Sequence, residues 1–173
     1  EKIEQIYRAN GVKYEKLKLS GDGITSAALK NSNAEILHVT PFHSFPSGIS
    51  ASASKRAEYV DWAYTRGGYI IEDDYESEFS VFSNPADTIY SIAPEGRIIY
   101  VNTFSKSLSA AMRIGYMVLP ESLLEVYEQK LGFYSCTVPS FDQYILADFI
   151  DSGELERHIN RTRRKFRKQK EKA

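Results

Sequence analysis

Short hydrophobic runs, rich in β-branched and aromatic residues, alternate along the chain with segments in which apolar residues recur at helical spacing. The runs predict a buried strand at residues 35–40 and further strands at 69–72, 97–102, 113–119 and 13–19. The helical patterns cover residues 1–10, 54–65, 120–131, 139–151 and 153–170, with a helical turn within 24–30. Short hydrophobic strands separated by helices are typical of a mostly parallel sheet covered on both faces. The sequence therefore predicts an α/β fold with a mostly parallel, mixed sheet and helices on both faces, in three αβα layers.

Several broad classes of protein are excluded by the same pattern. The longest apolar runs, such as residues 116–119, are far shorter than the roughly 20 residues that a membrane-spanning helix needs, so a transmembrane protein is excluded. No basic segment leads into a hydrophobic one at the start of the chain, so no signal peptide is visible. A single cysteine, Cys136, excludes an internal disulfide framework and fits a reducing compartment. The expected location is the cytoplasm.

Charge is distributed unevenly along the chain. The 173 residues carry a net charge of −1, from 22 Lys and Arg against 23 Asp and Glu. Residues 157–173 contain nine Lys or Arg and one acid, so this segment carries +8 and the remaining 156 residues carry −9. Such a tail fits either a nucleic-acid contact or a solvated helix face. Because Phe166 is its only aromatic residue, stacking on bases is not indicated, and the solvated face is the simpler interpretation.

Charged and hydroxyl side chains follow two of the predicted strands. An acidic segment at residues 72–78 comes after the strand at 69–72, and the segment at 103–109, which contains Lys106 among small hydroxyl residues, comes after the strand at 97–102. Arg113 follows seven residues beyond the lysine. Ligands of open α/β sheets bind outside the carboxyl ends of the strands. We therefore expect these groups to meet at one edge of the sheet.

Metal and nucleotide sites fit these residues poorly. The carboxylates of residues 72–78 lack the regular oxygen spacing and the central glycine of a calcium loop. The histidines and the cysteine do not have the spacing of zinc ligands. No Walker glycines precede Lys106, and no GxGxxG motif occurs. The sequence predicts no metal site and disfavours a nucleotide-binding enzyme.

A lysine among small hydroxyl residues at a strand end suits another chemistry. Its amine can form a Schiff base with an aldehyde while neighbouring hydroxyls bind a phosphate, which is what pyridoxal 5'-phosphate requires. This cofactor also needs a carboxylate at its pyridine nitrogen and a donor to its phenolate oxygen. Residues i and i+2 of an extended chain share a face, so Asp73 and Tyr75 can point toward one ring while Asp74 points away. An exposed acidic turn and an ordinary surface lysine would explain either half alone, but not the two together.

Three motifs then resemble a known family. IIEDDYESEF is followed about thirty residues later by IIYVNTFSKSLSAAMRIGYMVLP and preceded by HVTPFHSFPSG. In this order they strongly resemble the aminotransferase-like domain of MocR/GabR-type bacterial transcriptional regulators, which belongs to fold type I of the pyridoxal-phosphate enzymes. The resemblance covers nearly the whole chain and implies pyridoxal 5'-phosphate as the cofactor.

The resemblance also implies a role for individual residues. Lys106 would be the internal-aldimine lysine, Asp73 the partner of the pyridine nitrogen, and Tyr75 the donor to the phenolate oxygen. The implied phosphate contacts are Thr103, Ser105 and Arg113, whose planar guanidinium suits a phosphate.

The loop at residues 40–48 departs from the catalytic members of the family. It resembles the loop that reads Asn-Pro-Thr-Gly in catalytic aminotransferases, where the asparagine holds the phenolate oxygen, but Phe45 stands at that position. The regulators have the same kind of loop, so the departure favours the regulator branch and gives Tyr75 a larger share of the task. His43 is a candidate neighbour of the cofactor, and a loop histidine without that role is an equally good interpretation.

The resemblance also indicates how the chain is organised. Residues 1–152 would be a partial large cofactor-binding domain, and residues 153–173 a basic helix leading toward a small C-terminal domain that this chain lacks. The upstream glycine-containing loop that cradles the phosphate and the winged-helix domain of the regulators also lie outside it, so DNA would bind only through that absent domain. We expect that the chain alone does not transaminate. Family members are homodimers.

Three functions remain open at this point. The first is a pyridoxal-phosphate-binding sensor domain of a GntR/MocR-family regulator, in which an amine or amino-acid effector forms an aldimine. The second is a catalytic class I/II aminotransferase, in which the freed Lys106 is the general base. The third is a nucleic-acid-binding module that uses the basic C-terminal helix. The first two share every site residue, and Phe45 favours the first.

Overall fold

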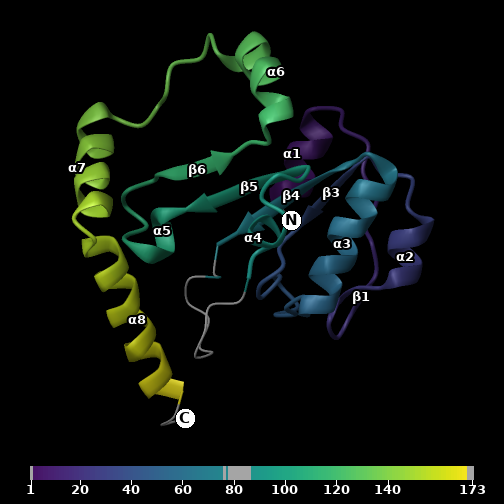
Figure 1. The fold of residues 1–173 in the computed structure, drawn as a ribbon, viewed down its shortest axis with the longest axis horizontal. Coiled ribbons are helices and arrows are strands. Elements are labelled where there is room, and N and C mark those ends of the chain that lie inside the picture. The colour runs from purple at the N-terminus through teal and green to yellow at the C-terminus, as the bar shows by residue number, and fades with distance from the viewer. Residues whose placement is uncertain (1, 76, 78–86, 171–173) are drawn as a thin grey trace.

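A four-stranded mixed sheet forms the centre of the molecule (Figure 1). The computed structural model describes residues 2–75, 77 and 87–170. The strands are β3 (Ile36–Val39), β4 (Tyr69–Asp74), β5 (Ile98–Thr103) and β6 (Gly115–Val118), in the order β3-β4-β5-β6. The first three run parallel and β6 runs antiparallel to β5. The predicted mostly parallel, mixed sheet is confirmed.

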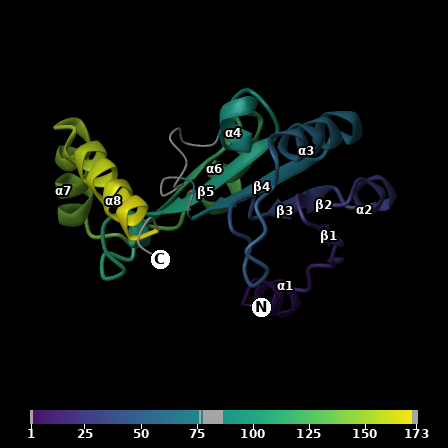
Figure 2. The same ribbon diagram turned by 90° about the horizontal axis from the view of Figure 1, so that it is seen from below.

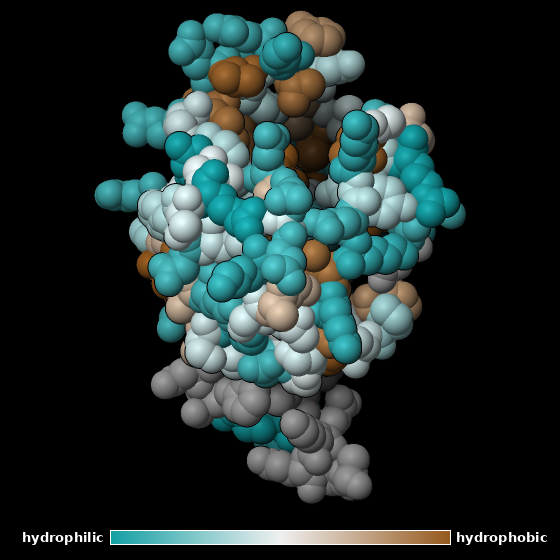
Figure 3. Space-filling model, turned by 90° about the vertical axis from the view of Figure 1, so that its right-hand side faces the viewer, coloured by the Kyte–Doolittle hydropathy of each residue, from teal (hydrophilic) through white to brown (hydrophobic). Residues whose placement is uncertain are grey.

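One face of the sheet carries the main core, under α3 (Ala53–Arg66) and α4 (Ile89–Ile92), with α2 (Ser26–Asn31) beside α3. Helix α3 begins at Ser52, whose Oγ accepts the Lys55 N–H at 3.2 Å, and ends at Gly67 in the left-handed conformation. The core residues are Ile24, Leu29, Leu37, Val39, Ala51, Tyr59, Trp62, Ala63, Ile70, Ile89 and Ile98. The outward surface on the α2 and α3 side is mainly hydrophilic, as expected for an outer layer (Figure 3).

The opposite face is covered by α1 (Lys2–Ala9) near β3 and approached by α6 (Glu121–Leu131) near β4. Figure 2 shows α1 on one side of the sheet and α3 and α4 on the other. The Tyr7 hydroxyl contacts the His38 imidazole, and Ser122 Oγ lies 3.4 Å from the Tyr69 hydroxyl. Helices therefore lie on both faces, as predicted.

The strand predicted at residues 13–19 is largely wrong. Only Leu19 and Ser20 form a strand, β1 (Leu19–Ser20), which pairs antiparallel with β2 (Gly23–Ile24). Lysines alternate with apolar residues there, which imitates a strand, but the segment runs along the surface, and no strand in the described part of the chain pairs with residues 13–18.

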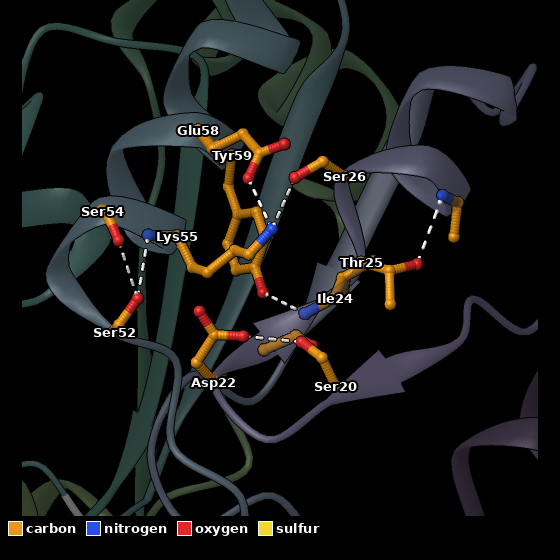
Figure 4. A network of polar contacts seen from close by, with 12 residues as sticks. Ser20, Asp22, Ile24, Thr25, Ser26, Ser52, Ser54, Lys55, Glu58 and Tyr59 are labelled. Carbon is orange, nitrogen blue, oxygen red and sulfur yellow. Dashed lines mark hydrogen bonds and ion pairs between the residues drawn. The ribbon is translucent and has the colours of Figure 1, made fainter.

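Polar contacts attach this β1–β2 hairpin and α2 to α3 (Figure 4). The Ile24 N–H donates to the Tyr59 hydroxyl at 2.7 Å. Lys55 Nζ donates to Ser26 Oγ at 2.7 Å and to Glu58 Oε2 at 2.8 Å. The hairpin is thereby held against α3 instead of joining the sheet.

Two further helices lie beside α5 and the start of β6. Helices α7 (Ser140–Asp151) and α8 (Glu154–Lys170) meet at Gly153, which has a φ of 73°. A second, smaller core joins Leu146 of α7 to Phe104, the first residue of α5 (Phe104–Ser107), and to Ile114, which directly precedes β6. Among the described residues, no helix is long and apolar enough to cross a membrane.

Candidate functional site

The carboxyl ends of β3, β4 and β5 lie at one edge of the sheet. Because the three strands are parallel and adjacent, the segments that follow them leave the sheet on the same side. These segments carry His43 after β3, Tyr75 after β4 and Lys106 in α5 after β5. The order and direction of these strands therefore place His43, Tyr75 and Lys106 at the same edge of the sheet. Glu76 and Glu78 of the acidic segment lie outside the described residues.

Lys106, Tyr75 and the backbone of His43 form one connected group at this edge. Lys106 Nζ lies 4.5 Å from the centroid of the Tyr75 ring, within the range of a cation–π contact. The Tyr75 hydroxyl donates to the His43 carbonyl oxygen at 2.6 Å. His43 itself has a φ of 47°, unusual for a residue other than glycine. Three chain segments are thus joined around one lysine amine and one phenol.

Asp73 and Asp74 point to opposite faces of the sheet, as their positions in an extended strand require. The Asp73 carboxylate remains 44% exposed, and its Oδ2 lies 3.9 Å from His38 Nε2 on the face covered by α1. Burial raises the pKa of Asp73, and the neighbouring His38 opposes that rise. An accessible carboxylate therefore stands at the strand end, backed by an imidazole.

Asp74 has a structural environment instead. It is buried and accepts hydrogen bonds from the Ser77 N–H at 2.9 Å, from the Ser77 hydroxyl, and from the Tyr100 hydroxyl at 2.7 Å. Asn102 Nδ2 donates in turn to the Tyr100 oxygen at 2.8 Å. These bonds fix the turn that follows β4.

Thr103 and Ser105 are held together at the start of α5. The Thr103 Oγ1 accepts the Ser105 N–H at 3.2 Å and lies 3.0 Å from Ser105 Oγ. It also lies 3.1 Å from the Ile114 carbonyl oxygen, and Ile114 follows Arg113 directly. Arg113 is exposed with a φ of 54°. Because β6 pairs antiparallel with β5, the backbone of Arg113, just before β6, returns to the end of β5 that carries Thr103.

Phe45, two residues beyond His43, has a largely exposed side chain. Its side chain is 76% exposed on the loop between β3 and α3. The structure therefore joins Lys106, Tyr75 and His43 by direct contacts, and Thr103 with Ser105, while Asp73 is linked to His38.

His38 is a neighbour that the sequence reasoning missed. In the sequence, the spacing of His38 excludes only a zinc site, and within residues 2–75, 77 and 87–170 no group of three potential metal ligands exists. The alternation of strand residues offered a signal, since His38 and Asp73 share a face once β3 and β4 pair in parallel. The register of that pairing is not visible in the sequence.

Comparison with known proteins identifies the family. The family model "Aminotransferase class I and II" matches residues 4–172. The chain belongs to this family. Its members are pyridoxal-phosphate-dependent enzymes and their relatives, so the resemblance drawn from the three motifs is confirmed.

Two curated relatives of this aminotransferase-family chain are transcriptional regulators. The chain is 35% identical over 164 residues to the uncharacterized HTH-type transcriptional regulator YhdI of Bacillus subtilis, covering 95% of this chain and 35% of that protein. It is 32% identical over 145 residues to the HTH-type pyridoxine biosynthesis transcriptional regulator PdxR of Corynebacterium glutamicum, covering 84% and 32%. The chain thus spans about a third of the length of these relatives. It corresponds to the aminotransferase-like part of MocR-type regulators.

A solved structure supports the fold independently. The kynurenine aminotransferase of Pyrococcus horikoshii, in complex with PMP, superposes with a TM-score of 0.81 at 26% identity, covering 92% of this chain and 42% of that one. The predicted α/β fold of a pyridoxal-phosphate transferase large domain is therefore confirmed as a fold.

The side chains at the sheet edge fit pyridoxal 5'-phosphate by their chemistry. The set contains one primary amine for the aldehyde, in Lys106, and one accessible carboxylate for the pyridine nitrogen, in Asp73. It also contains a phenol beside the amine, and two hydroxyls with a guanidinium for a phosphate. The assignment of roles to these residues stays a prediction.

Proposed function

We propose that the chain is a pyridoxal-phosphate-binding sensor domain of an HTH-type transcriptional regulator, responding to an amine or amino acid. The observation that carries this proposal is the Lys106 amine, held 4.5 Å over the Tyr75 ring at the edge that also bears Asp73. The similarity to YhdI over 95% of the chain supports the regulatory part. The cofactor supplies an aldehyde that reacts with primary amines and a ring that withdraws electrons.

Each residue of the site would have a defined task. Lys106 would hold the cofactor covalently, and Asp73 would keep a proton at the pyridine nitrogen. Tyr75 would donate its hydroxyl hydrogen to the phenolate oxygen, which requires it to leave the His43 carbonyl or to share its hydrogen with it. The phosphate would be bound by Thr103, Ser105 and Arg113.

Effector binding would release the lysine. Lys106 would attach the cofactor to α5, and the bound cofactor would supply an aldehyde carbon for which an effector amine competes with the Lys106 amine. We propose that residues 1–152 form part of the cofactor domain and that the basic helix at residues 153–173 leads toward a small domain. Motion along this route would reach a DNA-binding domain elsewhere in the whole protein, a homodimer in this proposal.

A second candidate is catalysis of amino transfer from an amino acid to a 2-oxo acid. It is favoured by the likeness to the Pyrococcus horikoshii enzyme at 26% identity. In that case the freed Lys106 amine would move the proton at the α-carbon of the substrate. Phe45 argues against it, because this exposed side chain offers no polar group to a phenolate oxygen.

Absorbance with added pyridoxal 5'-phosphate tests the proposal. We expect a band at roughly 420 nm in the wild-type chain that is lost in Lys106→Ala and kept in the control Lys130→Ala, an exposed lysine of α6. Borohydride reduction followed by peptide mass spectrometry should locate the attached cofactor on Lys106.

The outcomes separate the candidates. Attachment elsewhere, or no band in the wild-type chain, would contradict the cofactor assignment. Turnover of an amino acid and a 2-oxo acid, dependent on Lys106, would favour the enzyme. A band that shifts with added amines, without turnover in the whole protein, would favour the sensor.

A further inference from the structure

Tyr7, His38 and Asp73 form a line of contacts across the face of the sheet that α1 covers. The Tyr7 hydroxyl oxygen lies 2.5 Å from His38 Nδ1, and His38 Nε2 lies 3.9 Å from Asp73 Oδ2. The line begins in α1, crosses β3 and ends in β4. Neither Tyr7 nor His38 is among the residues assigned to bind the cofactor, although His38 lies next to Asp73, which is.

Burial determines the state of both ring systems. Burial lowers the pKa of His38, so its imidazole is neutral near pH 7 and has one N–H donor and one acceptor nitrogen. Burial also raises the pKa of Tyr7, so its hydroxyl keeps its hydrogen. The Asp73 carboxylate near Nε2 favours the tautomer that carries the imidazole hydrogen on Nε2, and in that tautomer Nδ1 accepts from the Tyr7 hydroxyl. The N–H of His38 therefore faces Asp73.

The 3.9 Å separation makes this an electrostatic contact and not a direct hydrogen bond. The positive end of the imidazole dipole faces a carboxylate that burial and the adjacent Asp74 both disfavour as an anion. A neutral imidazole opposes them through this dipole, which favours the charged form of the carboxylate beside Nε2. The exposed side of Asp73 remains free to meet a ligand, since its side chain is 44% exposed while that of His38 is 21% exposed.

We propose that Tyr7 and His38 are positioning residues that orient Asp73 and keep it anionic for the pyridine nitrogen of the cofactor. This inference rests on the proposed function and adds to it the source of the carboxylate's charge. Tyr7 fixes the imidazole tautomer, and His38 transmits that choice to Asp73. A helix outside the cofactor edge thereby contributes to cofactor affinity without touching the cofactor.

Titration of the full chain with pyridoxal 5'-phosphate, followed by absorbance, measures the effect. We expect His38→Leu to raise the Kd about fivefold or more, and Tyr7→Phe to raise it about threefold. The conservative His38→Gln should stay within about twofold of the wild type, because its amide can present an N–H in the place of Nε2–H. Tyr14→Phe is the matched control, since Tyr14 packs beside Tyr7 but bonds to Arg8 and Glu4.

A second readout needs no cofactor. Nitrogen-15 NMR of the His38 imidazole should show Nδ1 as the acceptor and Nε2 as the protonated nitrogen in the wild-type chain. In Tyr7→Phe this preference should weaken, and in Tyr14→Phe it should persist. Far-UV circular dichroism and urea unfolding of each variant establish that it is folded.

The results separate this inference from the proposed function. No band in the wild-type chain would overturn both. A wild-type band with an unchanged Kd in His38→Leu would overturn the inference alone. Equal losses in His38→Leu and His38→Gln would assign His38 to packing, and a protonated Nδ1 would exclude the hydrogen bond from Tyr7; either result would also overturn it.

Discussion

At the scale of single residues, Glu72 of β4 connects the sheet to α4 by accepting hydrogen bonds from the first N–H groups of that helix. Its side chain is fully buried in β4 and accepts the N–H groups of Ile89 and Tyr90, each at 2.8 Å. These are the first N–H groups of α4, which have no acceptor inside the helix. Burial raises the pKa of Glu72 to about 7, although both hydrogen bonds and Arg56 oppose the rise.

This raised pKa makes stability depend on pH. Between pH 4.5 and about 7 the folded chain keeps a proton on Glu72 that the unfolded chain has lost. The free energy of unfolding should therefore fall as pH rises through this range, by on the order of 3 kcal/mol from this residue. Urea unfolding at several pH values should show a smaller fall in Glu72→Gln than in the wild type. Glu95→Gln, at an exposed position, is the control, and equal pH slopes in the wild type and Glu72→Gln would refute the assignment.

The neighbouring aspartates should separate stability from binding. Asp74→Ala leaves the half-buried Tyr100 hydroxyl and the buried Ser77 without their acceptor, so we expect a loss of about 3 kcal/mol in the free energy of unfolding. Asp73→Ala removes a partly exposed carboxylate and should cost less than about 1 kcal/mol. Its effect should appear instead as weaker binding of pyridoxal 5'-phosphate. The opposite ranking in urea unfolding would show that the two faces of β4 have been assigned wrongly.

At the scale of elements, the joint between α3 and β4 requires two glycines in succession. Gly67 ends α3 with a φ of 65°, and Gly68 passes close to the backbone of Glu35, just before β3. A Cβ atom added to Gly68 would lie 2.5 Å from the Glu35 carbonyl oxygen and 3.5 Å from the Trp62 ring. This close passage brings β4 into pairing with β3, since the Tyr69 N–H donates to the same Glu35 oxygen at 2.9 Å.

Gly68→Ala should therefore destabilise the chain. The backbone of β3 or β4 would have to shift, and we expect a loss of about 2 kcal/mol or more in the free energy of unfolding, measured with urea. Gly21→Ala is the matched control, because a Cβ there meets nothing within 4 Å. Equal stability of the two variants would contradict the tight passage.

The sequence predicted most elements because their patterns are long or strongly apolar. Runs such as Ile98–Ile99 favour buried strands, and α3, α6, α7 and α8 follow helical spacing. Helices α4 and α5 have four residues each, too few for spacing to be recognised. The strand at 13–19 was wrong because alternation alone does not provide a pairing partner. The strand ends predict Asp73, Tyr75 and Lys106 as candidates, whereas the place of His38 beside Asp73 depends on the register of β3 with β4.

At the scale of the whole molecule, apolar side chains are unevenly covered. The main core lies between the sheet and α3, while the second core beside α7 contains few buried residues. Large exposed apolar residues gather in α6, α7 and the segment between them: Leu124, Val126, Tyr127, Leu131, Phe133, Tyr134, Phe141, Tyr144, Ile145 and Ile150. The candidate site lies at the ends of β3, β4 and β5, and these three strands contribute residues to the main core, which holds them in place.

The antiparallel direction of β6 has a consequence for the cost of binding. Residues 104–114 leave β5 and return beside it, and the loop is closed by the Phe104 N–H donating to the Ile114 carbonyl at 3.0 Å. Lys106 and Arg113 both lie within this closed loop. Their separation is therefore limited by folding, before any ligand arrives. A ligand that bears an aldehyde and a phosphate would meet a preorganised pair, and the entropy of bringing the two cations together would already have been lost when β6 paired with β5.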